Sequence, residues 1–146
     1  MRALFPATIL AALFLVGCGT TLTSKNDHNL VLTRPDEDIA AASKKAQDEL
    51  PKFLERLQHP KPGEQFAINA NFRDHATFEH MWVDHLKYDG KVITGKLADE
   101  PVLIKRLKKG EDVIIAKQVV YDWLIRSNGK TEGGYVQQVL KKKQGG

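Results

Sequence analysis

The stretch FEHMWVDHLKYDGKVITGKL, residues 78–97, decides the fold, because it predicts two strands joined by a tight turn. Asp89 and Gly90 at its centre predict a two-residue type I′ turn, since both residue types tolerate the positive φ that this turn needs. Alternation places one set of side chains on one face of the first strand: Phe78, His80, Trp82, Asp84, Leu86 and Tyr88. The opposite face receives Glu79, Met81, Val83 and His85. Neither face is purely polar, so we expect both to be at least partly covered.

A helical segment precedes this hairpin. The residues from Pro35 to Asp38 offer a cap near Asp36 and negative charge for the first helical turn. Apolar residues then recur at spacings of three and four as far as Leu57, which predicts one apolar stripe facing the core. Because Pro51 removes a helix hydrogen bond, we expect a kink or break within residues 48–50 and a second helical piece that runs to about Gln58.

The remaining chain reads mainly as strands. Alternating or buried apolar runs predict strands over residues 66–73, 113–116, 121–126 and 130–132, and Asn128-Gly129 predicts a second type I′ turn. Residues 102–107 read as a short connector or an edge strand, and residues 135–140 as a short closing helix, with a strand as the alternative. The expected fold is therefore α+β: a kinked N-terminal helix on a twisted antiparallel sheet of five or six strands that could curl into a small roll, with a short C-terminal helix.

The N-terminus has the pattern of an export signal. Arg2 precedes an apolar run over residues 3–16, and the run ends in Leu15-Val16-Gly17-Cys18, which resembles a bacterial lipobox. This resemblance implies that Cys18 carries lipid, including palmitate-type acyl chains, and anchors the protein to a membrane. Gly19, in the position where Asp would favour inner-membrane retention, implies the periplasmic face of the outer membrane if the source is Gram-negative. The predicted segments are a signal peptide (1–17), lipidated cysteine and flexible tether (18–35), one domain (36–142) and a tail (143–146).

Composition excludes several kinds of chemistry. Cys18 is the single cysteine, so a lipidated mature protein has no disulfide, no thiolate nucleophile and no cysteine zinc site. A net charge of +4 in 146 residues is too mild to indicate a nucleic-acid partner. No phosphate loop, dinucleotide fingerprint, His-Glu-x-x-His or Gly-x-Ser-x-Gly motif is present, and no cofactor is expected. The five-residue spacing of His75, His80 and His85 places neighbouring histidines on opposite strand faces, so no metal site is expected.

Trp82 is the centre of the candidate site. His80 and Asp84 flank it on the same predicted strand face, and an indole between two polar groups would form a shelf for a ligand. The alternative interpretation places Trp82 and Trp123 together in the core. A hydrolase that uses Glu79, His80 or Asp84 is a further hypothesis, although Glu79 and His80 should face opposite ways.

An ordered set of short motifs resembles the YegJ-like family of uncharacterised bacterial proteins. The set covers roughly residues 39–140 and comprises Leu50-Pro51-Lys52-Phe53, Glu79-His80-Met81-Trp82-Val83, Gly95-Lys96-Leu97, Gly110-Glu111-Asp112-Val113, Asp122-Trp123 and Gly133-Gly134-Tyr135. The resemblance implies a common fold and brings no activity or catalytic residues. We therefore expect a lipid-anchored envelope module that binds a protein, glycan or small ligand without catalysis. The alternatives are an envelope hydrolase and an immunity-type partner of a secreted toxin.

Overall fold

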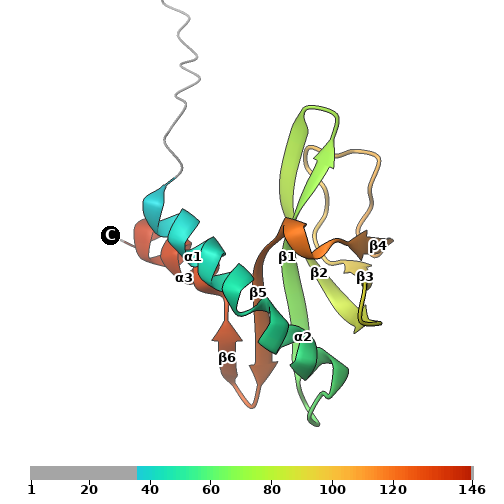
Figure 1. Cartoon of the computed structure of the whole chain (residues 1–146). Coiled ribbons are helices and arrows are strands. Elements are labelled where there is room, and N and C mark those ends of the chain that lie inside the picture. Colours follow the sequence, from blue (N-terminus) through green and yellow to red (C-terminus); the bar gives the residue numbers. More distant parts are fainter. Residues whose placement is uncertain (1–35, 146) are drawn as a thin grey trace, which may run out of the picture. The chain divides into compact units, whose positions relative to one another are not determined.

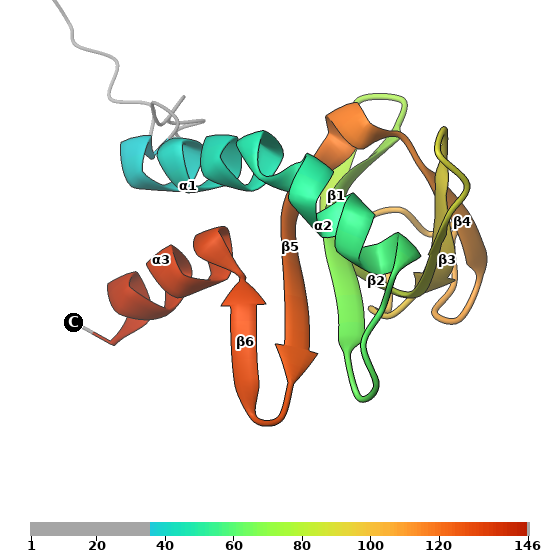
Figure 2. The same cartoon turned by 60° about the horizontal axis from the view of Figure 1, so that its bottom comes forward.

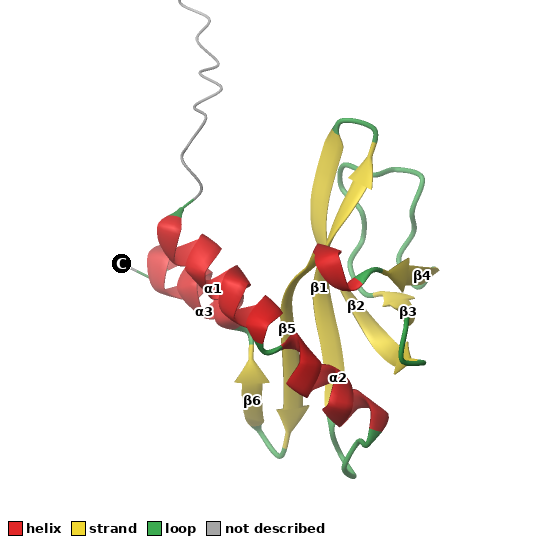
Figure 3. Ribbon diagram, viewed as in Figure 1, coloured by secondary structure: helices red, strands yellow, loops and turns green. Residues whose placement is uncertain are grey.

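The computed structural model describes residues 36–145, and the predictions for the signal peptide, Cys18 and the tether lie outside that range. Within it the chain forms the helices and strands of Figures 1 and 3, which confirms the α+β class. The elements are α1 (Glu37–Asp48), α2 (Leu50–Gln58), β1 (Gln65–Asp74), β2 (Thr77–Tyr88), β3 (Ile93–Leu97), β4 (Asp112–Ile115), the 3-10 helix η1 (Lys117–Val119), β5 (Val120–Ser127), β6 (Lys130–Gly133) and α3 (Tyr135–Gln144).

The six strands form one antiparallel sheet in the order β4-β3-β2-β1-β5-β6. Strands β1 to β4 follow one another as a meander, and β5 then pairs with the free side of β1. The edge strands β4 and β6 do not pair with each other, so the sheet stays open and does not close into a barrel. The long strands β1 and β2 lie in the middle, which places residues 78–88 at the centre of the fold.

The N-terminal helix breaks where the sequence predicted. Asp36 caps α1, because its Oδ1 accepts hydrogen bonds from the N–H groups of Asp38 (3.1 Å) and Ile39 (3.3 Å). Glu49 separates α1 from α2, and Pro51 then occupies the first turn of α2, where its missing N–H costs no helix bond. No helix among residues 36–145 is long and apolar enough to cross a bilayer.

Helices α1 and α3 lie side by side (Figure 2). The ammonium group of Lys143 joins them, since its Nζ lies 2.9 Å from Asp36 Oδ2 and 3.1 Å from Asp38 Oδ2. The predicted helix in the C-terminal segment is confirmed, and the alternative of a strand is wrong. Helix α3 also continues to Gln144, past the domain boundary that the sequence predicted at residue 142.

The core lies between α1, α2 and one face of the sheet. Phe53 of α2 is fully buried, and its ring centroid lies 5.8 Å from that of Phe66 and 5.1 Å from that of Trp123. The indole Nε1 of Trp123 donates a hydrogen bond to the Ala46 carbonyl at 2.9 Å, so this buried ring also satisfies its one donor. The expectation that Trp123 belongs to the core is confirmed.

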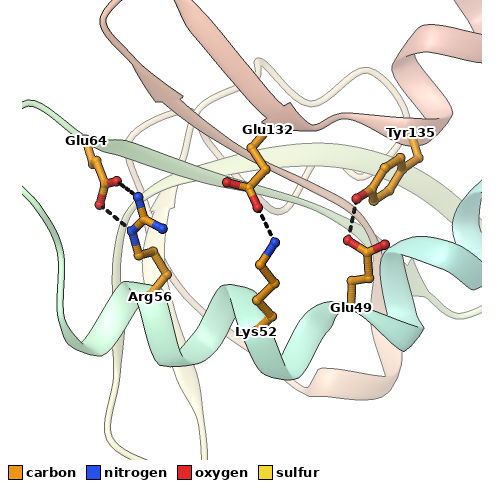
Figure 4. A network of polar contacts seen from close by, with 6 residues as sticks. All are labelled: Glu49, Lys52, Arg56, Glu64, Glu132 and Tyr135. Carbon is orange, nitrogen blue, oxygen red and sulfur yellow. Dashed lines mark hydrogen bonds and ion pairs between the residues drawn. The ribbon is translucent and has the colours of Figure 1, made fainter.

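Three polar contacts attach the start and one side of α2 to other elements (Figure 4). Glu49 accepts a hydrogen bond from the Tyr135 hydroxyl at 2.5 Å, Lys52 pairs with Glu132 of β6 at 2.7 Å, and the Arg56 guanidinium binds the Glu64 carboxylate through two nitrogens. The last contact fixes the loop between α2 and β1, because the Glu64 carboxylate also accepts the Lys61 N–H at 2.8 Å. These contacts hold α2 and this loop against the sheet.

A bulge changes the alternation of β2. His85 has a φ of 48°, and the pairing of β2 with β3 shifts its register between Asp84 and Lys87. Leu86 and Tyr88 therefore pack against the core, together with Met81 and Val83. The prediction that they share a face with Trp82 was wrong, because it assumed a regular strand.

The turn at Asp89-Gly90 also differs from the prediction. Tyr88 pairs with Ile93, which leaves a four-residue loop, and within residues 89–92 only Gly90 has a positive φ, of 97°. The carboxylate of Asp89 organises this loop by accepting the N–H groups of residues 91 and 92 at 2.8 and 2.9 Å. At Asn128-Gly129, by contrast, both φ values are positive (49° and 73°) and the connection has two residues, which confirms the type I′ prediction there.

Candidate functional site

One face of the central sheet carries the residues that the sequence singled out. Met81 and Val83 of β2 are buried in the core below α1 and α2. Their neighbours His80, Trp82 and Asp84 therefore point to the opposite face. We call it the helix-free face because α1 and α2 pack on the other side, although the first turn of α3 reaches its border through Gln137. Trp82 is partly exposed there, whereas Trp123 has no exposed surface. The structure thus separates the two tryptophans: Trp123 is core, and Trp82 is not.

A hollow of about 660 Å³ extends from Trp82 toward the loop that precedes β1. Ala67 of β1 and Leu124 of β5 lie opposite each other in the sheet; Ala67 is partly exposed, whereas Leu124 is buried below the hollow. Polar groups line the hollow as well, among them Asp84, Arg126 and Gln137 of α3. The hollow thus brings several polar and charged groups together beside apolar ones, which makes it a candidate ligand site.

The main chain of Trp82 is held by the segment that follows β3. Its N–H donates a hydrogen bond to Asp99 Oδ2 at 2.8 Å, and its carbonyl accepts one from the Ala98 N–H, also at 2.8 Å. The main chain that carries the Trp82 ring is therefore held by hydrogen bonds at both its N–H and its carbonyl. A pre-formed wall lowers the ordering cost of binding.

Asp84 and Arg126 are the two oppositely charged side chains that the hollow leaves most accessible. Asp84 Oδ1 lies 2.7 Å from Nδ1 of His85, and its side chain remains 43% exposed. Its carboxylate therefore keeps acceptor sites for a further donor. Among residues 36–145, no acidic side chain lies within ion-pair distance of Arg126. Glu64 also lines the hollow, but Arg56 covers it and its side chain is only 1% exposed.

His80 lies on the same face but outside the hollow. Its imidazole stacks on the ring of Tyr121, with ring centroids 3.9 Å apart and planes inclined by 20°. Desolvation lowers the pKa of His80, which favours the neutral imidazole. Trp82 lies between His80 and Asp84 along the strand, so these two groups do not meet.

Glu79 points to the other face and holds a connector. Its carboxylate accepts hydrogen bonds from the N–H groups of Val102 (2.6 Å), Leu103 and Ile104 (both 2.9 Å), and these bonds lower the pKa of Glu79. Residues 102–107 accordingly form no strand, and the connector reading of this segment is the correct one. Glu79 is thus engaged in positioning backbone and does not approach His80 or Asp84.

Two asparagines of β1 were missed by the sequence reasoning. Asn69 lies opposite Trp82 and Asn71 lies opposite His80, both on the helix-free face. The Oδ1 atoms of both are buried without a hydrogen-bond partner in the part of the chain that the structure describes, and Asn69 is only 9% exposed. Buried acceptors without hydrogen-bond partners are unusual in folded proteins because they lower stability. Selection for stability alone therefore does not explain the two asparagines. The alternation of β1 predicted their face but carried no sign of their burial.

Asp122 is a third residue whose role the sequence reasoning missed. It is 1% exposed, and its carboxylate accepts N–H groups of Trp123, Tyr135, Val136 and Gln137 at 2.9 to 3.2 Å. Asp122, in strand β5, therefore caps α3 in place of the N-cap residue Gly134, which has no side chain. Burial raises the pKa of Asp122, although the four donors oppose that rise. The cap also places Gln137 at the hollow.

Comparison with known proteins groups the chain without assigning an activity. It is 29% identical to the uncharacterized protein YegJ of Escherichia coli (strain K12) over 97 residues, which cover 66% of this chain and 63% of the relative. It is 35% identical over 63 residues to a putative ankyrin repeat protein of Neisseria meningitidis serogroup B, covering 43% of this chain and 25% of that protein. Both matches span less than two thirds of the relative's own length. No solved structure matches the chain.

The family comparison covers more of the fold. The model described as "Uncharacterized protein conserved in bacteria (DUF2314)" matches residues 36–145, from the cap of α1 to the end of α3. The helices at both ends of the domain, the six strands and the helix-free face all fall within this match. The chain therefore belongs to this family of uncharacterized bacterial proteins, DUF2314.

Proposed function

We propose that this chain is a lipid-anchored protein of the bacterial cell envelope that binds a ligand on the helix-free face and does not transform it. The lipobox-like sequence at residues 15–18 supports the anchor on Cys18. Membership of a bacterial family agrees with such an anchor, because this lipidation pattern is bacterial. The domain then contributes the binding surface.

The position of Trp82 carries the binding proposal. A tryptophan that lies at a hollow, partly exposed and with its main chain held on both sides, offers a large rigid surface to a ligand at little entropic cost. Asp84 and Arg126 add charged groups to the same hollow. The surface thus combines an aromatic platform with polar groups that would orient a ligand.

The geometry favours binding over the hydrolase hypothesis. A hydrolase would need at least two of its acid, base or nucleophile groups within reach of one substrate atom. Glu79 is committed to the backbone of residues 102–104 on the other face, and Trp82 separates His80 from Asp84. The three candidate groups therefore do not form one constellation.

The binding proposal is tested with Trp82 as the reporter. The low-mass fraction of a bacterial periplasmic extract is titrated into the protein while tryptophan emission is followed, and the extract is analysed by mass spectrometry before and after incubation. We expect a saturable emission change that Trp82→Ala abolishes and the control Lys52→Ala, on the α2 side, retains, with the masses in the extract unchanged. A response that survives Trp82→Ala, or masses that change with time, would contradict the proposal.

The anchor is tested separately. Cells that express the full chain are grown with a palmitate analogue, and labelling and membrane fractionation are compared for wild type and Cys18→Ser. We expect label only in the wild type, because the thiol of Cys18 must accept the lipid. A wild-type protein that takes up no label and fractionates as soluble would rule out the lipoprotein assignment.

A further inference from the structure

The ligand class follows from how the two accessible charges lie in the hollow. Asp84 extends from β2 and Arg126 from β5, the two strands that flank β1. In β5, Leu124 pairs with Ala67 of β1 and Arg126 pairs with Gln65 of β1. In β2, Asp84 comes directly after the residue that pairs with Ile68 of β1. The two charges thus lie across β1 from each other and about two residues apart along the strands.

Strand geometry converts this register into a distance. Neighbouring strands are about 4.8 Å apart and residues rise by about 3.3 Å, so the Cα atoms of Asp84 and Arg126 are separated by about 12 Å. The two side chains are not within ion-pair distance of each other. Between them lies Ala67, whose small side chain leaves room above the sheet, while its neighbour Leu124 is buried below the hollow.

We propose that the hollow binds a short peptide with free termini, whose ammonium group pairs with Asp84 and whose carboxylate pairs with Arg126. An extended chain spans about 3.3 to 3.6 Å per residue, so three or four residues match the separation of the Cα atoms of Asp84 and Arg126. The guanidinium of Arg126 is suited to a carboxylate, because its fork of donors binds both oxygens. The body of the peptide lies over Ala67 and against the ring of Trp82.

Other charged groups near the hollow are consistent with this polarity. Glu64 is held by Arg56 and does not compete for the ammonium group. His85 contacts Asp84 and fixes the orientation of its carboxylate. A neutral sugar could also stack on Trp82 and hydrogen-bond to both groups, but it carries no charge to pair with them, whereas a peptide with free termini offers an opposite charge to each. The inference rests on the proposed binding function and narrows it to peptides.

The experiment uses defined peptides and modified termini. Trialanine and tetra-alanine are titrated into the full chain in free form, with an N-terminal acetyl group, and as C-terminal amides, while the emission of Trp82 is followed. We expect wild type to bind the free forms at least tenfold more tightly than either blocked form. In Arg126→Gln the preference for a free carboxylate should disappear, and in Asp84→Asn the preference for a free amine. The control Lys130→Gln should behave like wild type.

Three outcomes decide the matter. If amidation and acetylation leave the affinity of wild type unchanged, or if free peptides cause no emission change at millimolar concentration, the peptide assignment is overturned. If chitotriose binds instead and Trp82→Ala abolishes that binding, the binding face stands and the peptide assignment falls. If a response to either probe survives Trp82→Ala, the proposed function falls as well.

Discussion

The cap that Asp122 provides for α3 gives the sharpest test of the fold. In Asp122→Asn, Oδ1 still accepts the N–H groups of Trp123 and Tyr135. An NH₂ group replaces Oδ2, however, and faces the N–H groups of Val136 and Gln137, which lie at 3.0 and 3.2 Å from Oδ2 in the wild type. Two charge-assisted hydrogen bonds are lost, each worth about 1.5 kcal/mol or more. Relief from burying a charge returns part of that, so we expect a net loss of about 2 kcal/mol in the free energy of unfolding.

Urea unfolding measures this loss. With a denaturant slope of about 1 to 2 kcal/mol per molar for a domain of this size, the midpoint should fall by about 1 to 2 M. Hydrogen exchange should show faster opening at residues 135–137, while the control Asp112→Asn, on the exposed edge strand β4, leaves the midpoint close to that of wild type. A midpoint that rises in Asp122→Asn would show that the cost of burying the carboxylate exceeds the value of its hydrogen bonds. An unchanged midpoint with unchanged exchange would refute the capping role.

Four further predictions concern single positions. Trp123→Ala should lower the free energy of unfolding by about 3 to 5 kcal/mol, as for large aromatic residues in cores. Trp82→Ala should lower it far less and should remove most of the quenching of tryptophan emission by acrylamide. Equal losses of stability in the two variants would contradict the assignment of Trp123 to the core and of Trp82 to the surface. The pKa of Glu79 lies below its ordinary value of 4.5, so the stabilising contribution of its carboxylate is fully present above pH 4.5 and is lost as the pH falls through the folded-state pKa. As the pH is lowered, the melting temperature should therefore fall less steeply in Glu79→Gln than in wild type. Gly133→Ala should destabilise the domain by at least about 2 kcal/mol in urea unfolding, because φ is 77° and the new Cβ would meet the carbonyl and indole of Trp123; a wild-type midpoint would show that β5 and β6 can separate at no cost. Asn69→Leu should raise the free energy of unfolding by about 1 kcal/mol, since it removes a buried acceptor without a partner. A lower urea midpoint than that of wild type would mean that the amide is satisfied in solution.

The sequence by itself determined the order and kind of most of the helices and strands. Those predictions rested on signals that act over a few residues: the apolar stripe and Pro51 for the broken helix, alternation for β1, and Asn128-Gly129 for the turn before β6. Local sterics and hydrogen bonds decide such features, so a short window of sequence contains their cause. The placement of His80, Trp82 and Asp84 on one face of β2 was predicted for the same reason, because the strand is regular up to Asp84.

Tertiary structure decided what depends on contacts between distant residues. The bulge at His85 and the four-residue loop after Tyr88 follow from how β3 must pair with β2, and they moved Leu86 and Tyr88 to the core. Asp122 caps a helix that begins 13 residues later in the chain, and Asn69 became buried only because β2 and β5 pair on both sides of it. The charges of Asp84 and Arg126 likewise meet one hollow only because β1 lies between their strands. No local pattern contains these causes, since each arises when segments far apart in the sequence exclude water together.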